Sequence, residues 1–231
     1  ALGLAPGLSW DKPATNSPVQ AMLKSVHLTG ENPTNYYTLH ERARTLIQQK
    51  KWAEAREPLT LLTRLFPTER GPDSSWARLA EVHRGLGDTN AEIQALDRWT
   101  EIDGEAHAGY RRLMELALER GDWPTVQRNA ERCLAINPLI GATYQHLARS
   151  QIALNQPSSA IASLETVLKL DPGDPAETHF QLAQLLAPTQ VPAARRHVLQ
   201  ALEEAPRHRD ALRLLSRLPA SVQPKPAPEV K

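Results

Sequence analysis

Residues 138–172 read PLIGATYQHLARSQIALNQPSSAIASLETVLKLDP, and the prolines at the two ends stand 34 residues apart. The same step forward reaches Pro206, and the same step back reaches Gly104. Each marker follows an apolar stretch with helical spacing and is a residue that ends helices. A helix breaker that recurs every 34 residues is typical of a copied helix–turn–helix unit. The next step back needs 37 residues to reach Pro67, so we predict an insertion of three residues within Thr68–Asp73.

Two runs of apolar residues lie within this stretch, separated by a short turn. The first run contains Tyr144 and Ala148, and the second contains Ala160 and Leu164. Residues at i, i+3, i+4 and i+7 share one face of a helix, so each run predicts a helix with one buried face. The small alanines let the two helix backbones approach each other. Asn155 between the runs tolerates the positive φ that a helix end requires.

This pattern resembles the tetratricopeptide repeat. The third copy carries the resemblance on Tyr110, Leu113, Ala117, Gly121, Asp122, Trp123, Ala130, Leu134 and Pro138. The fourth copy carries it on Tyr144, Leu147, Ala148, Ala160, Ile161, Leu164, Leu168, Asp171 and Pro172. Five copies in phase cover about three quarters of the chain. The resemblance implies an all-α fold, a right-handed α-solenoid of helix–turn–helix repeats with a C-terminal capping helix.

The repeat spacing divides the chain into a central array and two ends. The array is predicted to span 36–206, with five repeats at 36–72, 73–106, 107–140, 141–174 and 175–206. Residues 1–17 are predicted to form an irregular arm in which Trp10 packs against a helix, and 18–35 a short helix and a connection. A capping helix is predicted at 207–218, and the Pro- and Lys-rich tail at 219–231 is predicted to be disordered.

Two copies depart from the common pattern. The second copy has Glu92 where a small residue is expected and Gly104 in place of proline, so we expect its second helix to be shifted. The first helix of the fifth copy slips by one residue at Leu182 and Ala183. Its turn, Ala187–Val191, contains a proline and no glycine, and we expect this turn to be locally distorted.

Composition and charge exclude several classes of function. The formal net charge is only +1, so nucleic acid is not an expected partner. No apolar run approaches the ~20 residues of a membrane span, so membrane insertion is not expected. No signal-peptide pattern stands out, and the compartment stays open between the cytoplasm, the periplasm and secretion. The preference for arginine over lysine and the many alanines are compatible with a bacterial source.

The sequence shows no constellation of catalytic or metal-binding residues. The eight histidines occur singly, and no two have the i, i+4 spacing of a helical metal site. A glycine-rich phosphate loop and a nucleophile elbow are absent. The single cysteine, Cys133, falls at an apolar position and is predicted to be a small core residue. We therefore predict no catalytic residue, no metal site and no cofactor, and expect that the chain is not an enzyme.

The resemblance further implies that the first helices of the repeats line a concave groove. The implied groove residues are Tyr37, His40, Arg44, Gln48, Glu81, Arg84, Arg111, Glu115, Gln145 and Arg149. The four arginines of this set would suit the carboxylates of a peptide through bidentate hydrogen bonds. Glu81 and Glu115 interrupt the line of arginines, and a solvated face with local salt bridges is the alternative interpretation. Arrays that clamp acidic chaperone tails have Lys and Asn where this chain has His40, Arg44 and Arg78, so that ligand is not predicted.

Together these observations predict a non-catalytic scaffold that binds a protein or peptide segment in the concave groove. One alternative is a C-terminal structural region of a larger enzyme. The chain begins at Ala1 and ends in a Pro-rich tail, and it is loosely similar to repeat regions that follow metallopeptidase domains in some bacterial secreted proteins. A further alternative is self-association through the edge left by the imperfect fifth copy.

Overall fold

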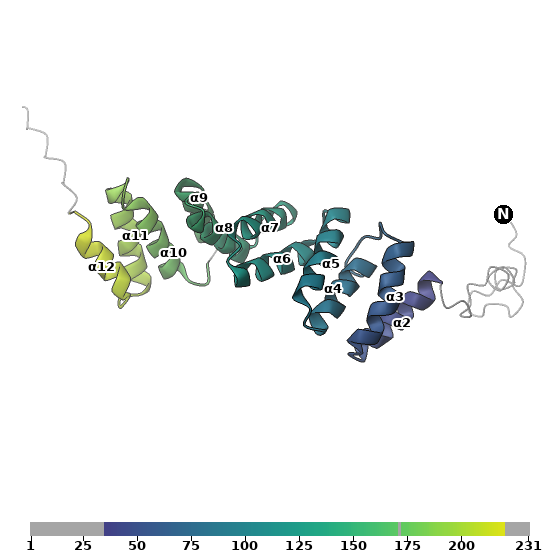
Figure 1. Ribbon diagram of the computed structural model, residues 1–231. Coiled ribbons are helices and arrows are strands. Elements are labelled where there is room, and N and C mark those ends of the chain that lie inside the picture. The colour runs from purple at the N-terminus through teal and green to yellow at the C-terminus, as the bar shows by residue number, and fades with distance from the viewer. Residues whose placement is uncertain (1–34, 171, 220–231) are drawn as a thin grey trace, which may run out of the picture. The chain divides into compact units, whose positions relative to one another are not determined.

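The structure is a computed structural model that describes residues 35–170 and 172–219 (Figure 1). Within these residues the chain forms eleven helices and no strand, which confirms the predicted all-α class. The predicted arm at 1–17 with Trp10, and the short helix predicted within 18–35, lie outside the described residues, as does the predicted tail beyond Pro219.

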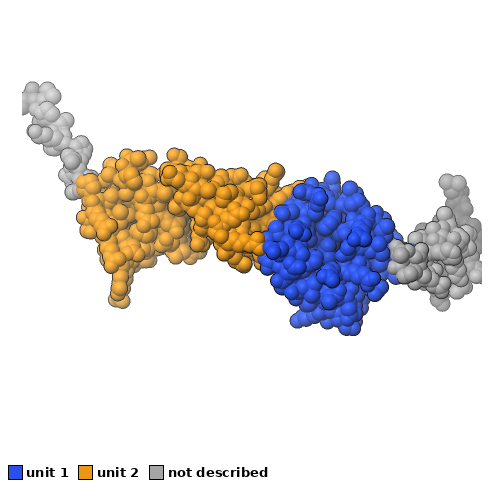
Figure 2. Space-filling view, viewed as in Figure 1, with its two compact units in different colours: residues 1–102 blue, residues 103–231 orange. Residues whose placement is uncertain are grey.

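The chain divides into two compact units, residues 1–102 and 103–231, and each is described by itself (Figure 2). In both units, each helix packs against the next along the chain. The described helices of unit 1 are α2 (Tyr36–Gln48), α3 (Trp52–Leu65), α4 (Ser75–Gly85) and α5 (Thr89–Ile102). Those of unit 2 are α6 (His107–Arg120), α7 (Trp123–Ile136), α8 (Gly141–Ala153), α9 (Pro157–Lys169), α10 (Pro175–Leu186), α11 (Val191–Glu204) and α12 (Arg209–Arg217).

Helix α5 does not show the shift that was expected for the second copy. It begins and ends 34 residues before α7, so this expectation was wrong. Glu92 is buried in the first turn of α5, with an exposed fraction of 3%. A carboxylate is favourable there because the helix dipole places partial positive charge at the N-terminus. Gly104 lies in the turn after α5, which ends at Ile102 as its counterpart α7 ends at Ile136.

Local sequence signals account for the helix boundaries. Several helices begin at a side chain that accepts a hydrogen bond from the first turn, namely Asn35, Ser74, Asp122, Asp174 and His208. Helix α6 ends at Gly121, whose φ of 68° is the left-handed conformation of a helix C-terminus. The turns inside the other early repeats also hold one residue with positive φ, at Lys50, Gly87 and Asn155.

The turn of the fifth repeat differs from these, as expected. No residue between α10 and α11 has a positive φ. The turn is closed instead by hydrogen bonds from the N–H groups of Thr189 and Gln190 to the carbonyl of Leu186, at 3.1 and 2.7 Å. Pro188 and the absence of glycine therefore give this helix pair a different connection.

Small residues occupy the contacts between paired helices. Ala55, Ala130, Ala160 and Ala194 have no exposed surface, which lets the helices approach closely. Cys133 is also buried and lies 4.0 Å from the carbonyl oxygen of His107. This burial confirms the prediction of a small core residue, and it raises the pKa of the thiol to about 11.

Among the described residues, no helix is both long enough and apolar enough to span a bilayer.

The contact between Gly85 and Trp52 leads to a first prediction. A Cβ atom on Gly85 would lie 2.8 Å from Cγ of Trp52 and closer still to two further ring atoms. Alanine is better than glycine in a helix by about 1 kcal/mol. The clash with a rigid indole costs about 1–3 kcal/mol, so we expect Gly85→Ala to destabilise the protein in urea unfolding.

Gly104→Ala is the matched control, because nothing lies within 4 Å of a Cβ at that position. We expect this variant to be as stable as the wild type or slightly more stable. Equal stability of the two variants would show that the indole of Trp52 does not pack on Gly85.

Candidate functional site

Unit 2 contains two pockets on the first helices of its repeats. One pocket, of about 400 Å³, lies between α6 and α8. The other, of about 390 Å³, lies between α8 and α10. His146 lines both, so the two pockets meet at this residue. We call them together the pocket pair.

The α6–α8 pocket is lined by one arginine, one glutamate and two histidines. Arg111 and Glu115 stand one turn apart on α6, with Arg111 Nε 4.0 Å from a carboxylate oxygen of Glu115. Glu115 also interacts with Arg112, at 3.3 Å from Nη1. Ala108 and Ala142 are the small residues of the lining and leave room above the helix backbones. The lining therefore offers the guanidinium group of Arg111 beside the carboxylate of Glu115, which also pairs with Arg112 of the same helix.

The α8–α10 pocket has a more defined arrangement of polar groups. The guanidinium of Arg149 lies over the ring of Trp123, 5.5 Å from its centroid. This cation–π contact holds the charge in place, because the ring face attracts it. On the α10 side, Glu177 accepts a hydrogen bond from Gln181 at 2.9 Å and lies 3.4 Å from Nε2 of His208.

His146 is half-buried where the two pockets meet. Its pKa is lowered by burial and by the neighbouring Arg149, against the opposing charge of Glu115. The imidazole is therefore mainly neutral at neutral pH, with one nitrogen that donates and one that accepts.

The predicted groove residues fall into two groups. Arg111, Glu115, Gln145 and Arg149 all line the pocket pair. They lie on one face of α6 and of α8 because their spacing follows the helix period.

The remaining six predicted residues belong to unit 1. Tyr37, Arg44, Gln48 and Arg84 are exposed, and Glu81 and His40 are half-buried. Nη1 of Arg44 is 3.6 Å from Glu41 of its own helix. Arg44 and Arg84 lie in unit 1, and Arg111 and Arg149 lie in unit 2, so the predicted line of four arginines stays a prediction.

Sequence reasoning missed several residues of the pocket pair. His146 was not selected, although it follows the predicted Gln145 and its position also faces the pockets. Thr178 and Gln181 were missed because the slip in the fifth copy obscured which positions of α10 face inward. A helical wheel centred on Glu177 would have found Gln181, since i and i+4 share a face.

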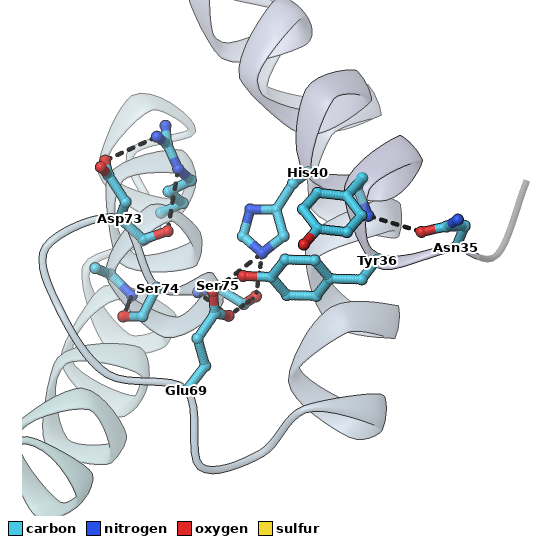
Figure 3. Close-up of polar contacts among 10 residues, drawn as sticks. Asn35, Tyr36, His40, Glu69, Asp73, Ser74 and Ser75 are labelled. Carbon is cyan, nitrogen blue, oxygen red and sulfur yellow. Dashed lines mark hydrogen bonds and ion pairs between the residues drawn. The ribbon is translucent and has the colours of Figure 1, made fainter. Parts of the chain in front are cut away.

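His40 belongs to a polar cluster around Glu69, in the inserted segment between α3 and α4 (Figure 3). The carboxylate accepts hydrogen bonds from Tyr36 Oη at 2.6 Å, from Ser75 Oγ at 2.5 Å and from Ser75 N at 2.9 Å. His40 Nε2 lies 3.1 Å from Glu69 Oε1. The hydrogen bond to Glu69 raises the pKa of Tyr36 to about 12. The cluster fixes the insertion to α2 and to the start of α4.

This cluster contains a serine, a histidine and a glutamate but not the arrangement of a catalytic triad. A triad needs one ring nitrogen on the acid and the other on the serine. Here the same nitrogen, His40 Nε2, lies near both Glu69 and Ser75 Oγ, the latter at 3.5 Å. Ser75 donates directly to Glu69 and has no exposed surface. The contacts hold the carboxylate and do not activate the serine.

The described residues contain no larger cluster of metal-ligating side chains. In the part of the chain that the structure describes, no group of three or more His, Cys, Asp or Glu residues could hold a metal ion.

Comparisons with known proteins bear on the fold. A family model described as a tetratricopeptide repeat matches residues 142–174. No curated protein sequence matches the chain. Among solved structures, MamA has a TM-score of 0.55 at 14% identity, covering 74% of this chain and 92% of MamA.

Two further solved structures are similar to this chain. YrrB, a TPR protein with an unusual peptide-binding site, has a TM-score of 0.54 at 18% identity, covering 69% of this chain and 81% of YrrB. MamA 41-end from Desulfovibrio magneticus RS-1 has a TM-score of 0.50 at 16% identity, covering 71% and 92%. Together with the matched repeat at residues 142–174, these likenesses show that the chain has the α-solenoid fold of tetratricopeptide-repeat proteins.

Proposed function

We propose that the chain is a non-catalytic interaction scaffold that binds an extended peptide segment along the pocket pair of unit 2. The observation that supports this proposal is the continuity of the two pockets through His146. Three successive first helices, α6, α8 and α10, contribute the lining, so a ligand that spans both pockets would contact three repeats. An extended chain suits this site because it advances about 3.3 Å per residue and presents side chains at intervals.

The polar lining indicates what the peptide should carry. Each pocket has one arginine, Arg111 in the first and Arg149 in the second. Guanidinium groups bind carboxylates through paired hydrogen bonds, so the peptide should carry an acidic side chain or its own C-terminal carboxylate. Gln145 is exposed in the second pocket and offers an amide that can bond to a peptide backbone.

Arg149 is the stronger candidate of the two arginines. Trp123 already holds its guanidinium in position, so less side-chain freedom is lost on binding. Arg111 shares its charge with Glu115, and a ligand carboxylate must compete with that glutamate. YrrB shows that a protein of the same fold can have a peptide-binding site. At 18% identity that likeness concerns the fold, and the proposal rests on the pockets of this chain.

The test uses peptides selected from a displayed random library against the untagged full chain. We expect the selected peptides to carry a carboxylate. Arg149→Glu should weaken their binding about tenfold or more, which corresponds to about 1.4 kcal/mol. Arg111→Glu/Arg149→Glu should weaken it further, as measured by fluorescence polarisation.

Arg132→Glu is the matched control, because Arg132 is exposed on α7 and lines neither pocket. It makes the same change in net charge as Arg149→Glu, so a general electrostatic effect would weaken binding equally in these two single variants. If the double variant keeps wild-type affinity, the peptide does not bind in the pocket pair.

The alternative functions stay predictions. No observation on the described residues favours a structural region of a metallopeptidase-type enzyme or self-association, and neither is proposed here.

A further inference from the structure

Two histidines from different helices face each other in the fifth repeat. Nδ1 of His179 on α10 lies 3.0 Å from Nδ1 of His197 on α11. The two rings are stacked with a centroid distance of 5.2 Å and an angle of 30° between their planes. Both side chains are half-buried, and neither lines the pocket pair.

The protonation of this pair leaves a nitrogen lone pair in the contact. A hydrogen bond between two Nδ1 atoms requires one of them to be protonated and the other to accept. The ring that accepts therefore has a free lone pair on its Nδ1 and is a neutral imidazole in this contact. A neutral imidazole is the form that binds metal ions.

The separation of the two nitrogens also matches chelation. Imidazole nitrogens bind zinc at about 2.0–2.1 Å. Two such ligands that meet at an angle of about 90–110° are separated by roughly 2.9–3.4 Å. The observed distance of 3.0 Å falls in this range. If the proton on the donating Nδ1 moves to Nε2 of the same ring, both rings stay neutral and both Nδ1 lone pairs are free for one ion.

The charges near the pair favour a cation. Glu203 and Glu204 act on His179, and Glu165 acts on His197. Arg196 is the cation that acts on His197. Carboxylates therefore outnumber the cation around the pair, and water can complete the coordination of an ion.

We propose that His179 and His197 chelate one divalent ion of the late first-row transition metals, such as Zn²⁺, Ni²⁺ or Cu²⁺. Imidazole suits these ions, and their affinity for nitrogen sites is the highest in the series. The ion would join α10 to α11 in the repeat whose turn lacks a positive-φ residue. Such a link would stabilise the folded hairpin by mass action.

The test is a titration of the untagged full chain with Ni²⁺ and with Zn²⁺ alone, followed by calorimetry and thermal unfolding. We expect one ion bound per chain and an increase in Tm that grows with the concentration of free ion. His179→Gln and His197→Gln should each abolish both effects. His146→Gln, which removes a histidine of the pocket pair, should keep both effects.

A second measurement does not depend on variants. In the wild type, added Zn²⁺ should shift the Nδ1 resonances of His179 and His197 in proton–nitrogen correlation spectra. Circular dichroism of the metal-free variants checks that they are folded. Unchanged binding in His179→Gln, or no shift of these Nδ1 resonances, would overturn the proposal and leave a simple hydrogen-bonded pair.

Discussion

Replacing Leu164 with alanine is expected to reduce the free energy of unfolding by about 2–5 kcal/mol. Leu164 on α9 is 1% exposed and packs with Ala148 of α8 and Leu182 of α10. Its side chain therefore joins two consecutive repeats. In a repeat fold each unit contacts only its neighbours, so the loss of this contact cannot be shared with a distant core.

Urea unfolding followed by circular dichroism measures this loss. Leu139→Ala is the control, because Leu139 is 75% exposed before α8 and should change stability by less than about 0.5 kcal/mol. Hydrogen exchange adds a spatial test. Protection of the backbone amides should fall most in α10 to α12, because Leu164 contributes to the packing of α10 on α9. Equal losses in the two variants would contradict the assigned packing.

The 34-residue period was sufficient to predict the helices, because it depends on local chemistry. Ala160 and Leu164 recur at positions that need a small and a large residue, and the structure buries both. Asn155 was predicted to tolerate positive φ in the turn and has a φ of 56°. The expectation for Glu92 was wrong because it judged the residue by size alone. The carboxylate lies in the first turn of α5, where the helix dipole favours negative charge.

The candidate site was predictable only where it depends on helix register. Arg111 and Arg149 were assigned inward positions from the resemblance to the tetratricopeptide repeat, and both line pockets in unit 2. The pairing of His179 with His197 could not be predicted in this way, because it joins two helices across 18 residues of sequence. Helical spacing identifies residues that share a face, but it does not identify the residues that meet across two faces.

The same limit applies to the insertion of the first repeat. The spacing from Pro67 to Gly104 predicted additional residues in Thr68–Asp73 but gave no reason why they should be ordered. The structure supplies one, because Glu69 accepts hydrogen bonds from Tyr36 and Ser75. Asp73 also accepts a hydrogen bond from Arg78 at 2.8 Å, so two carboxylates hold the insertion.

Glu69→Ala is accordingly expected to reduce the free energy of unfolding by about 2–4 kcal/mol, because hydrogen bonds to a charged and largely buried acceptor are lost. The side chain of Glu69 is 15% exposed, so water replaces these bonds poorly. Tyr36 and Ser75 are left with donors that face a cavity. Urea unfolding at pH 7 measures the loss.

Glu69→Gln tests the role of the charge through its pH dependence. Burial alone would raise the pKa of Glu69, but the hydrogen bonds from Ser75 and Tyr36, with the charge of His40, lower it below the ordinary 4.5. The folded protein then binds this proton more weakly than the unfolded chain. The stability that the carboxylate contributes is present above pH 4.5 and is lost as the pH falls through the lower folded-state pKa.

We therefore expect the wild type to lose more stability than Glu69→Gln when the pH is lowered from about 6 to about 3, because only the wild type carries this carboxylate. Glu101→Gln is the matched control. It removes an exposed glutamate whose partner is Arg98 of the same helix, and such surface pairs contribute little. Glu101→Gln should therefore follow the wild type over the whole pH range. If Glu69→Gln also follows the wild type, the carboxylate of Glu69 is not held by Tyr36 and Ser75, and the insertion is fixed in another way.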